Sequence, residues 1–115
     1  MRFVLAIYSD ETSWWQDTPA DEMETTLAAY GAFSDEARAS GVLVSEAGLE
    51  PPPEAKTVRM RSGAAVVTDG PYADGKEQLG GFYVLDCATI DEAAEWAAKL
   101  PIGDDGCVEI RAIIE

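Results

Sequence analysis

The stretch that decides the fold is Asp69–Asp86, which reads DGPYADGKEQLGGFYVLD. It opens with Asp69-Gly70-Pro71, residues that favour a turn. A polar loop follows, and the apolar and aromatic residues at its end predict a strand over 80–87. The pair Gly80-Gly81 at the start of that strand predicts a bulge or the close approach of another backbone. We therefore expect the rest of the chain to position this loop and strand.

Hydrophobic periodicity predicts the other elements. Two helices are expected, one from a capping Thr18 to Gly41 and one from a capping Thr89 to Pro101. Asp10–Asp17 is expected to be a loop in which Trp14 and Trp15 either cover the core or form part of a pocket wall. The other predicted strands cover residues 2–9, 42–49, 57–61, 64–68 and 108–114. Ser62-Gly63 has the length and composition of a hairpin turn.

The predicted order is strand, helix, strand, hairpin, strand, helix, strand. Without the hairpin this is βαββαβ, so we predict a ferredoxin-like α+β fold with an inserted β-hairpin, in a single domain over residues 1–115. Two helices cover one face of such a sheet. Val4, Ala6 and Tyr8 on the other face are too apolar for open water, which predicts a homodimer formed through that face.

Composition limits the classes of binding partner that we expect. The net charge is −14, with 8 basic residues against 22 acidic ones, so we expect no binding to nucleic acid or to anionic membranes. No apolar run reaches the roughly 20 residues of a membrane helix, and a cytoplasmic location is expected. The chain has no histidine, and Cys87 and Cys107 are isolated, so no metal or cofactor is predicted. A disulfide between them stays open, although reduced thiols are favoured.

Asp69 is the candidate catalytic residue. A carboxylate at the end of a strand is accessible to ligands, and partial desolvation would raise its pKa toward that of a general base. The alternative is a purely structural aspartate whose oxygen accepts backbone amide hydrogen bonds within the turn.

The candidate binding residues are mainly basic. Arg59, Arg61 and Arg111 are predicted to point outward from strands, where they could clamp a carboxylate or pair with acids such as Glu109. Lys76 could flank a ligand or be a solvated loop residue. Tyr8 and Tyr72 are the candidate hydrogen-bond donors.

The motif resembles the signature of the DGPF-domain proteins, a branch of the YCII-related superfamily. Its most specific part is Lys76–Gly81, KEQLGG, and the resemblance extends over nearly the whole chain. It implies a dimeric ferredoxin-like domain and, for the wider superfamily, a histidine–aspartate pair that acts as acid and base in a cleft. Only the aspartate carries over here, as Asp69. Some relatives are encoded beside alternative sigma factors, which implies a regulatory role.

Two hypotheses follow. In the first, a cleft between subunits binds or converts a small anionic molecule without a cofactor, with Asp69 as base, an arginine as clamp and Tyr8 or Tyr72 as donor. In the second, the chain is a non-catalytic dimeric sensor or a regulatory partner of a transcription factor. The sequence leaves open whether the protein is an enzyme.

Overall fold

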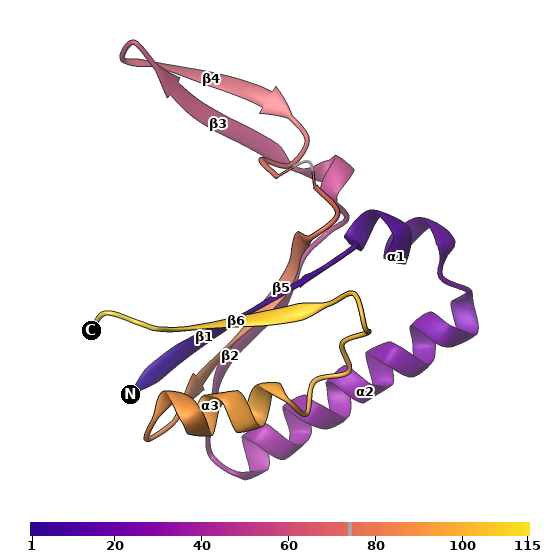
Figure 1. Ribbon diagram of the computed structural model, residues 1–115, viewed down its shortest axis with the longest axis vertical. Coiled ribbons are helices and arrows are strands. Elements are labelled where there is room, and N and C mark those ends of the chain that lie inside the picture. Colours follow the sequence, from indigo (N-terminus) through magenta and orange to yellow (C-terminus); the bar gives the residue numbers. More distant parts are fainter. Residues whose placement is uncertain (74) are drawn as a thin grey trace.

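The computed structural model describes residues 1–73 and 75–115, so Asp74 of the DGPY loop lies outside the described residues. The chain extends over 46 × 40 × 20 Å (Figure 1). Its elements are β1 (Arg2–Ser9), α1 (Glu11–Asp17), α2 (Ala20–Ala39), β2 (Leu43–Gly48), a 3-10 helix (Pro52–Glu54), β3 (Lys56–Arg61), β4 (Ala64–Asp69), β5 (Gln78–Asp86), α3 (Ile90–Ala97) and β6 (Cys107–Ala112).

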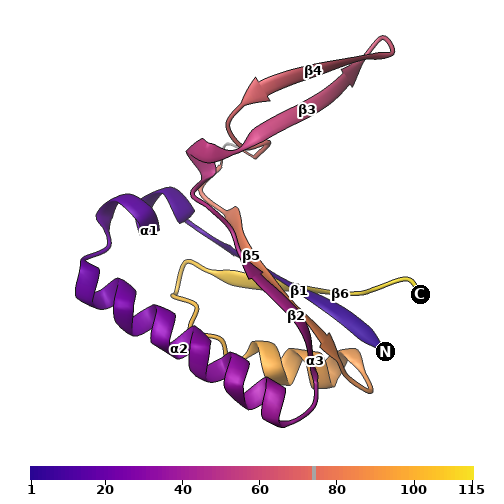
Figure 2. The ribbon, with the colours of Figure 1, turned by 180° about the vertical axis from the view of Figure 1, so that it is seen from behind.

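Four strands form one antiparallel sheet in the order β2-β5-β1-β6. The connection through α1 and α2 carries the chain from β1 past one strand position to β2, and β5 fills the position between them. Figures 1 and 2 show all three helices on the same face of this sheet. The expected α+β class, with a four-stranded antiparallel sheet and a separate hairpin, is confirmed.

The core lies between the sheet and the helices. Phe3, Leu5 and Leu85 point from β1 and β5 into it and are the largest fully buried side chains. Phe33 of α2 packs edge-on against Tyr83, with ring centroids 4.8 Å apart. Such aromatic pairs stabilise beyond the area that they bury. The core thus joins α2 and α3 to one face of the sheet.

The opposite face of the sheet, called here the open face, has no helix over it. Val4 lies opposite Val84 and Ala6 opposite Phe82 in the register of β1 and β5, and all four are only partly buried. This confirms that β1 is apolar on both sides, as predicted. Tyr8 lies on the same face, opposite Cys107 of β6.

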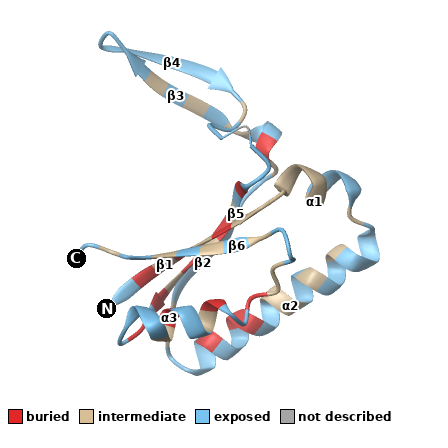
Figure 3. Ribbon diagram, viewed as in Figure 1, coloured by how far each residue is buried: buried red, intermediate tan, exposed pale blue. Residues whose placement is uncertain are grey.

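Strands β3 and β4 form a hairpin that projects away from the four-stranded sheet (Figure 1). Ser62 and Gly63 both have positive φ, at 50° and 82°, as a tight two-residue turn requires. Figure 3 shows the hairpin as mostly exposed. Val58 and Met60, which the alternation pattern predicts to face inward, are 60% and 68% exposed. That prediction is wrong for the single chain, because no second layer from residues 1–73 and 75–115 lies against the hairpin.

Two predictions about helix starts need correction. Residues 11–17 form helix α1 and not a loop, with Asp10 as its N-cap accepting from the Ser13 amide at 3.1 Å. Helix α2 begins at Ala20, and its N-cap is Pro19 without a capping side chain, so Thr18 does not cap it. The predicted cap of α3 is confirmed, because Thr89 Oγ accepts from the Glu92 amide at 3.1 Å.

Candidate functional site

Two hollows lie on opposite faces of the sheet. The hairpin groove, of about 680 Å³, lies where the hairpin joins the open face. The helix-side cavity, of about 970 Å³, lies between the sheet, α1 and the first half of α2. Strand β1 separates them, since Ile7 and Ser9 line the helix-side cavity and Tyr8 lines the hairpin groove.

The hairpin groove brings together two of the predicted binding residues. Tyr8 from β1 and Tyr72 from the DGPY loop both line it, and Lys56 of β3 lies beside them. The guanidinium carbon of Arg59 lies 5.3 Å from the centroid of the Tyr72 ring, within the range of a cation–π contact. Arg59 itself does not line the groove, so its link to the groove is this contact with Tyr72.

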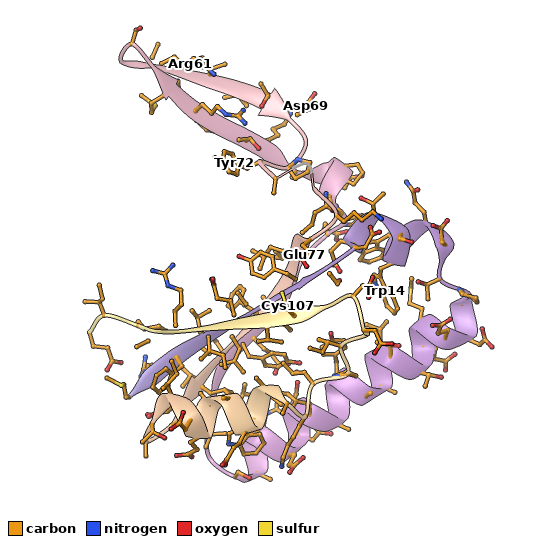
Figure 4. All side chains as sticks on the ribbon, in the orientation of Figure 1. Trp14, Arg61, Asp69, Tyr72, Glu77 and Cys107 are labelled. Atoms are coloured by element: carbon orange, nitrogen blue, oxygen red, sulfur yellow. The ribbon has the colours of Figure 1, made fainter. Side chains whose placement is uncertain are left out.

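Asp69 lies at the base of the hairpin and does not line the groove (Figure 4). Its Oδ1 accepts a hydrogen bond from Lys56 Nζ at 2.6 Å, and its side chain is 86% exposed. The partial desolvation on which the general-base hypothesis depends is therefore missing from the single chain. The turn itself is closed by Gly70, which has a φ of 95° and donates its amide to Ala55 O at 2.7 Å. A catalytic role for Asp69 stays a prediction.

The other predicted cations lie in three separate parts of the chain. Arg61 lies near the tip of the hairpin (Figure 4), Lys76 lies exposed in the loop before β5, and Arg111 lies on β6 opposite Val4. The alternative pairing of Arg59 with Glu109 is wrong, because β3 and β6 belong to different sheets. The structure thus joins Tyr8, Tyr72 and Arg59 and leaves the others apart.

The helix-side cavity was not predicted from the sequence. Trp14 and Trp15 of α1, Tyr30 of α2 and Tyr83 of β5 contribute aromatic side chains to its lining, and Figure 4 shows Trp14 on the side of α1 that faces α2. Space remains because α2 buries only side chains of its second half, whereas Leu27 in its first half is 58% exposed. The helical spacing of Met23, Leu27, Tyr30, Phe33 and Ala37 predicts one buried stripe along α2, and this prediction is wrong for the first half of the helix.

Polar groups in this cavity are held by specific contacts. Ser34 Oγ donates to Tyr30 O at 3.1 Å and lies 3.3 Å from Tyr83 Oη. Burial raises the pKa values of both tyrosine hydroxyls. Both hydroxyls therefore stay neutral across the physiological pH range.

The Glu11 carboxylate is held in a defined position in the cavity wall by a hydrogen bond and by the space that a glycine leaves. Ser9 Oγ donates to Glu11 Oε2, and a Cβ at Gly80 would collide with the same carboxylate. Gly80 is the extra residue of a β-bulge, because the register passes from Ile7–Gly81 to Tyr8–Leu79. The predicted bulge is thus confirmed, and its glycine leaves space for an acid from α1.

All charged side chains among the described residues that line the cavity are acidic. No lysine or arginine from the described part of the chain lines it. The acids that line it are Asp10, Glu11, Asp17, Glu22, Glu46 and Asp105. Within residues 1–73 and 75–115, no three Cys, Asp or Glu side chains cluster closely enough to hold a metal ion.

A sequence signal for this cavity existed. Asp10 is a good N-cap residue, and Trp14 and Trp15 follow within two turns, which is consistent with a short helix.

The two cysteines add nothing to either site, since Cys87 is buried, Cys107 is exposed and both are free. None of the described helices is both long and apolar enough to cross a membrane.

The fold and the two hollows define a small α+β domain with candidate sites on both faces of one sheet. Comparison with known proteins then gives the family: the chain matches the YCII-related domain over residues 1–115 and belongs to that family. It is 36% identical over 117 residues to an uncharacterized protein of Rhizobium meliloti (strain 1021), covering 98% of this chain and 92% of that protein.

Proposed function

We propose that this protein is a ferredoxin-like homodimer that binds a small anionic molecule in the hairpin groove. The strand order β2-β5-β1-β6 supports the fold, because it is the order in which a βαββαβ chain pairs its two halves in one antiparallel sheet. The inserted hairpin β3-β4 leaves that order unchanged.

Exposed apolar surface supports the homodimer. Phe82 and Val84 on the open face and Val58 and Met60 on the hairpin have no second layer against them. A two-stranded hairpin is marginally stable in water without further packing. A second copy of the chain supplies that packing by an isologous contact, in which the same surface of each subunit meets the other.

The distribution of basic residues carries the anion proposal. Three of the 8 basic residues are ion-paired away from the groove, namely Arg2 with Glu115, Arg38 with Asp35 and Lys99 with Glu36. The remaining five lie on the hairpin, in its following loop or on the open face: Lys56, Arg59, Arg61, Lys76 and Arg111. Of these, Lys56 is paired with Asp69 at the base of the hairpin. Glu50 and Glu54 also line the groove, so the attraction for an anion comes from the arginines of the hairpin beside it. In a chain with a net charge of −14, the hairpin is where an anion meets the least repulsion.

Binding is proposed and not catalysis. The exposed Asp69–Lys56 pair supplies no desolvated base, whereas Arg59 on Tyr72 is a suitable anion contact without one. A binding role agrees with the sensor hypothesis better than with acid–base chemistry.

Phenyl phosphate is a suitable probe, since its ring can stack on Tyr72 while its phosphate meets Arg59. We expect Arg59→Gln to weaken binding about tenfold, the loss of one charge-assisted contact. Arg38→Gln changes the net charge equally on α2 and should leave the affinity unchanged. Titration of the amide NMR spectrum measures both, and equal weakening by the two variants would refute the groove site.

The homodimer is tested by mass in solution. Light scattering should give twice the 12.3 kDa of one chain. Phe82→Asp on the open face should give the single mass, whereas Ile90→Asp, at an exposed apolar position on α3, should leave the dimer intact. A single-chain mass for the unmodified protein would rule out the proposed assembly.

A further inference from the structure

We propose that the helix-side cavity binds an organic cation, an amine or quaternary ammonium group with apolar substituents. This site is separate from the proposed anion groove and has the opposite charge preference. It rests on the geometry of the cavity, the aromatic side chains and the ordered carboxylate described above.

The cavity has the size of a small-molecule site. Its volume of about 970 Å³ is near the upper end of the roughly 300–1,000 Å³ typical of ligand pockets. Six segments line it: the end of β1, α1, α2, the last residues of β2, the first half of β5 and the loop after α3. A ligand there contacts both α1 and the sheet.

The aromatic lining favours a cation. Trp14, Trp15, Tyr30 and Tyr83 all line the cavity. The negative faces of such rings attract ammonium groups, most strongly for indole, and aromatic cages are a recurring way to bind quaternary ammonium ligands. Neutral apolar ligands would also fit these walls, so the charge of the lining decides between them.

Two glutamates place negative charge beside these rings. Glu46 lies opposite Tyr83 in the register of β2 and β5, and Glu11 is held by Ser9 at the Gly80 bulge. Both act on the tyrosines, since Glu11 contributes to the raised pKa of Tyr30 and Glu46 to that of Tyr83, after burial as the larger cause in each case. Because six acids and no lysine or arginine of the described residues line the cavity, the field inside it is negative.

No internal cation neutralises this field in the described chain. Lys99 pairs with Glu36 at 2.6 Å, lies 4.6 Å from the Trp96 ring centroid, and does not line the cavity. A bare metal ion is disfavoured because the described acids do not cluster as metal ligands. An organic cation, which contacts rings and carboxylates over a larger area, matches this lining better.

The test uses benzyltrimethylammonium and the three indole N–H signals of the protein at low ionic strength. Trp14 and Trp15 line the cavity, whereas Trp96 packs on Phe33 outside it and serves as an internal reference. We expect saturable shifts of the first two signals only. Phenylmethanesulfonate, with the same benzyl group and a negative charge, should leave them unchanged.

Variants separate cavity binding from general attraction to an acidic protein. Glu46→Gln should weaken benzyltrimethylammonium binding roughly fivefold, in line with the loss of one partly exposed charge. Glu109→Gln makes the same charge change on the open face, opposite Ala6, and should not weaken it.

Three results would overturn the proposal: equal weakening by the two variants, equal shifts of Trp96, or no saturable shift with the cation. The phenyl phosphate titration is independent of these outcomes, because it reports on the groove. If the titration of one proposed site gives a negative result, the other proposal can still be tested by its own probe.

Discussion

The two faces of the sheet differ in both charge and packing. On the helix side, aromatic rings and acids surround a cavity beneath α1 and α2. Apolar residues lie on the open face and the hairpin, and five of the 8 basic residues lie on the hairpin, in the loop that follows it or on the open face. Adjacent residues of one strand take part in both, since Ile7 and Ser9 face the cavity and Tyr8 faces the groove.

The comparison shows that net charge conceals local charge. A value of −14 suggests a uniformly anion-repelling surface, but alternation along β-strands places different side chains on the two faces. Each face can then have its own binding preference.

Neighbours on β5 should give the largest difference in stability. Leu85 is fully buried on the helix side, and Leu85→Ala should lower the free energy of unfolding by about 2–5 kcal/mol. Val84→Ala on the open face removes fewer contacts in the single chain and should cost about 1 kcal/mol or less. Urea unfolding measures both, and equal costs would contradict the one-sided core.

Alanine substitutions at the adjacent Gly80 and Gly81 should differ in how much they destabilise the fold, because their surroundings differ. A Cβ at Gly81 would lie 2.8 Å from the Ala47 carbonyl oxygen, so Gly81→Ala must displace β2 and should cost about 1–3 kcal/mol. A Cβ at Gly80 meets only the flexible end of Glu11.

Gly80→Ala should therefore cost less stability than Gly81→Ala but selectively weaken benzyltrimethylammonium binding. Unfolding and titration of the two variants check this. If Gly80→Ala keeps full cation affinity, the position of the Glu11 carboxylate is irrelevant to the cavity.

Alkaline pH should destabilise the fold through the cavity tyrosines. Burial raises the pKa values of Tyr30 and Tyr83 above their ordinary value of 10, so the folded chain keeps protons that the unfolded chain loses. Their contribution is complete below about pH 10 and is lost as the pH rises through the raised values.

Burial also raises the pKa of the Cys87 thiol above its ordinary value of 9, so Cys87 adds to this loss of stability from about pH 9. Tyr83→Phe should therefore flatten the fall in unfolding free energy above pH 10, and an unchanged slope in that variant would argue against a buried hydroxyl.

The smallest effect is expected for Asp69→Asn. Asp69 and Lys56 are 86% and 68% exposed, and exposed ion pairs contribute about 0–1 kcal/mol. Thermal or urea unfolding should show a loss within that range. A much larger loss would mean that dimer formation buries Asp69, which would restore the basis of the general-base prediction.

Local sequence signals predicted the elements well where one segment decides the structure. The Ser62-Gly63 turn, the end of α2 near Gly41 and the Thr89 cap all depend on neighbouring residues. The glycine bulge before Phe82 was also predictable, since only glycine leaves room for such an approach. The acid that approaches Gly80 was not, because it comes from a distant segment.

The helix-side cavity was not predicted as a whole because six segments form it and its space depends on how α2 lies on the sheet. Hydrophobic periodicity places Leu27 and Phe33 on one stripe but does not say which of them contacts β5. The exposure of Val58 and Met60 has a similar cause, since a strand pattern indicates a face and not its partner. The sequence pattern around Asp69 predicts a turn, and the contacts of Asp69 in the structure are local to the base of the hairpin.

The most direct test of opposite preferences is one amide-labelled sample titrated separately with benzyltrimethylammonium and phenyl phosphate. We expect the cation to shift signals of Trp14, Trp15 and Glu46, and the anion to shift those of Tyr8, Arg59 and Tyr72. Two separate sets of residues would support two sites divided by β1. A common set for both probes, or shifts spread evenly over the protein, would contradict the account.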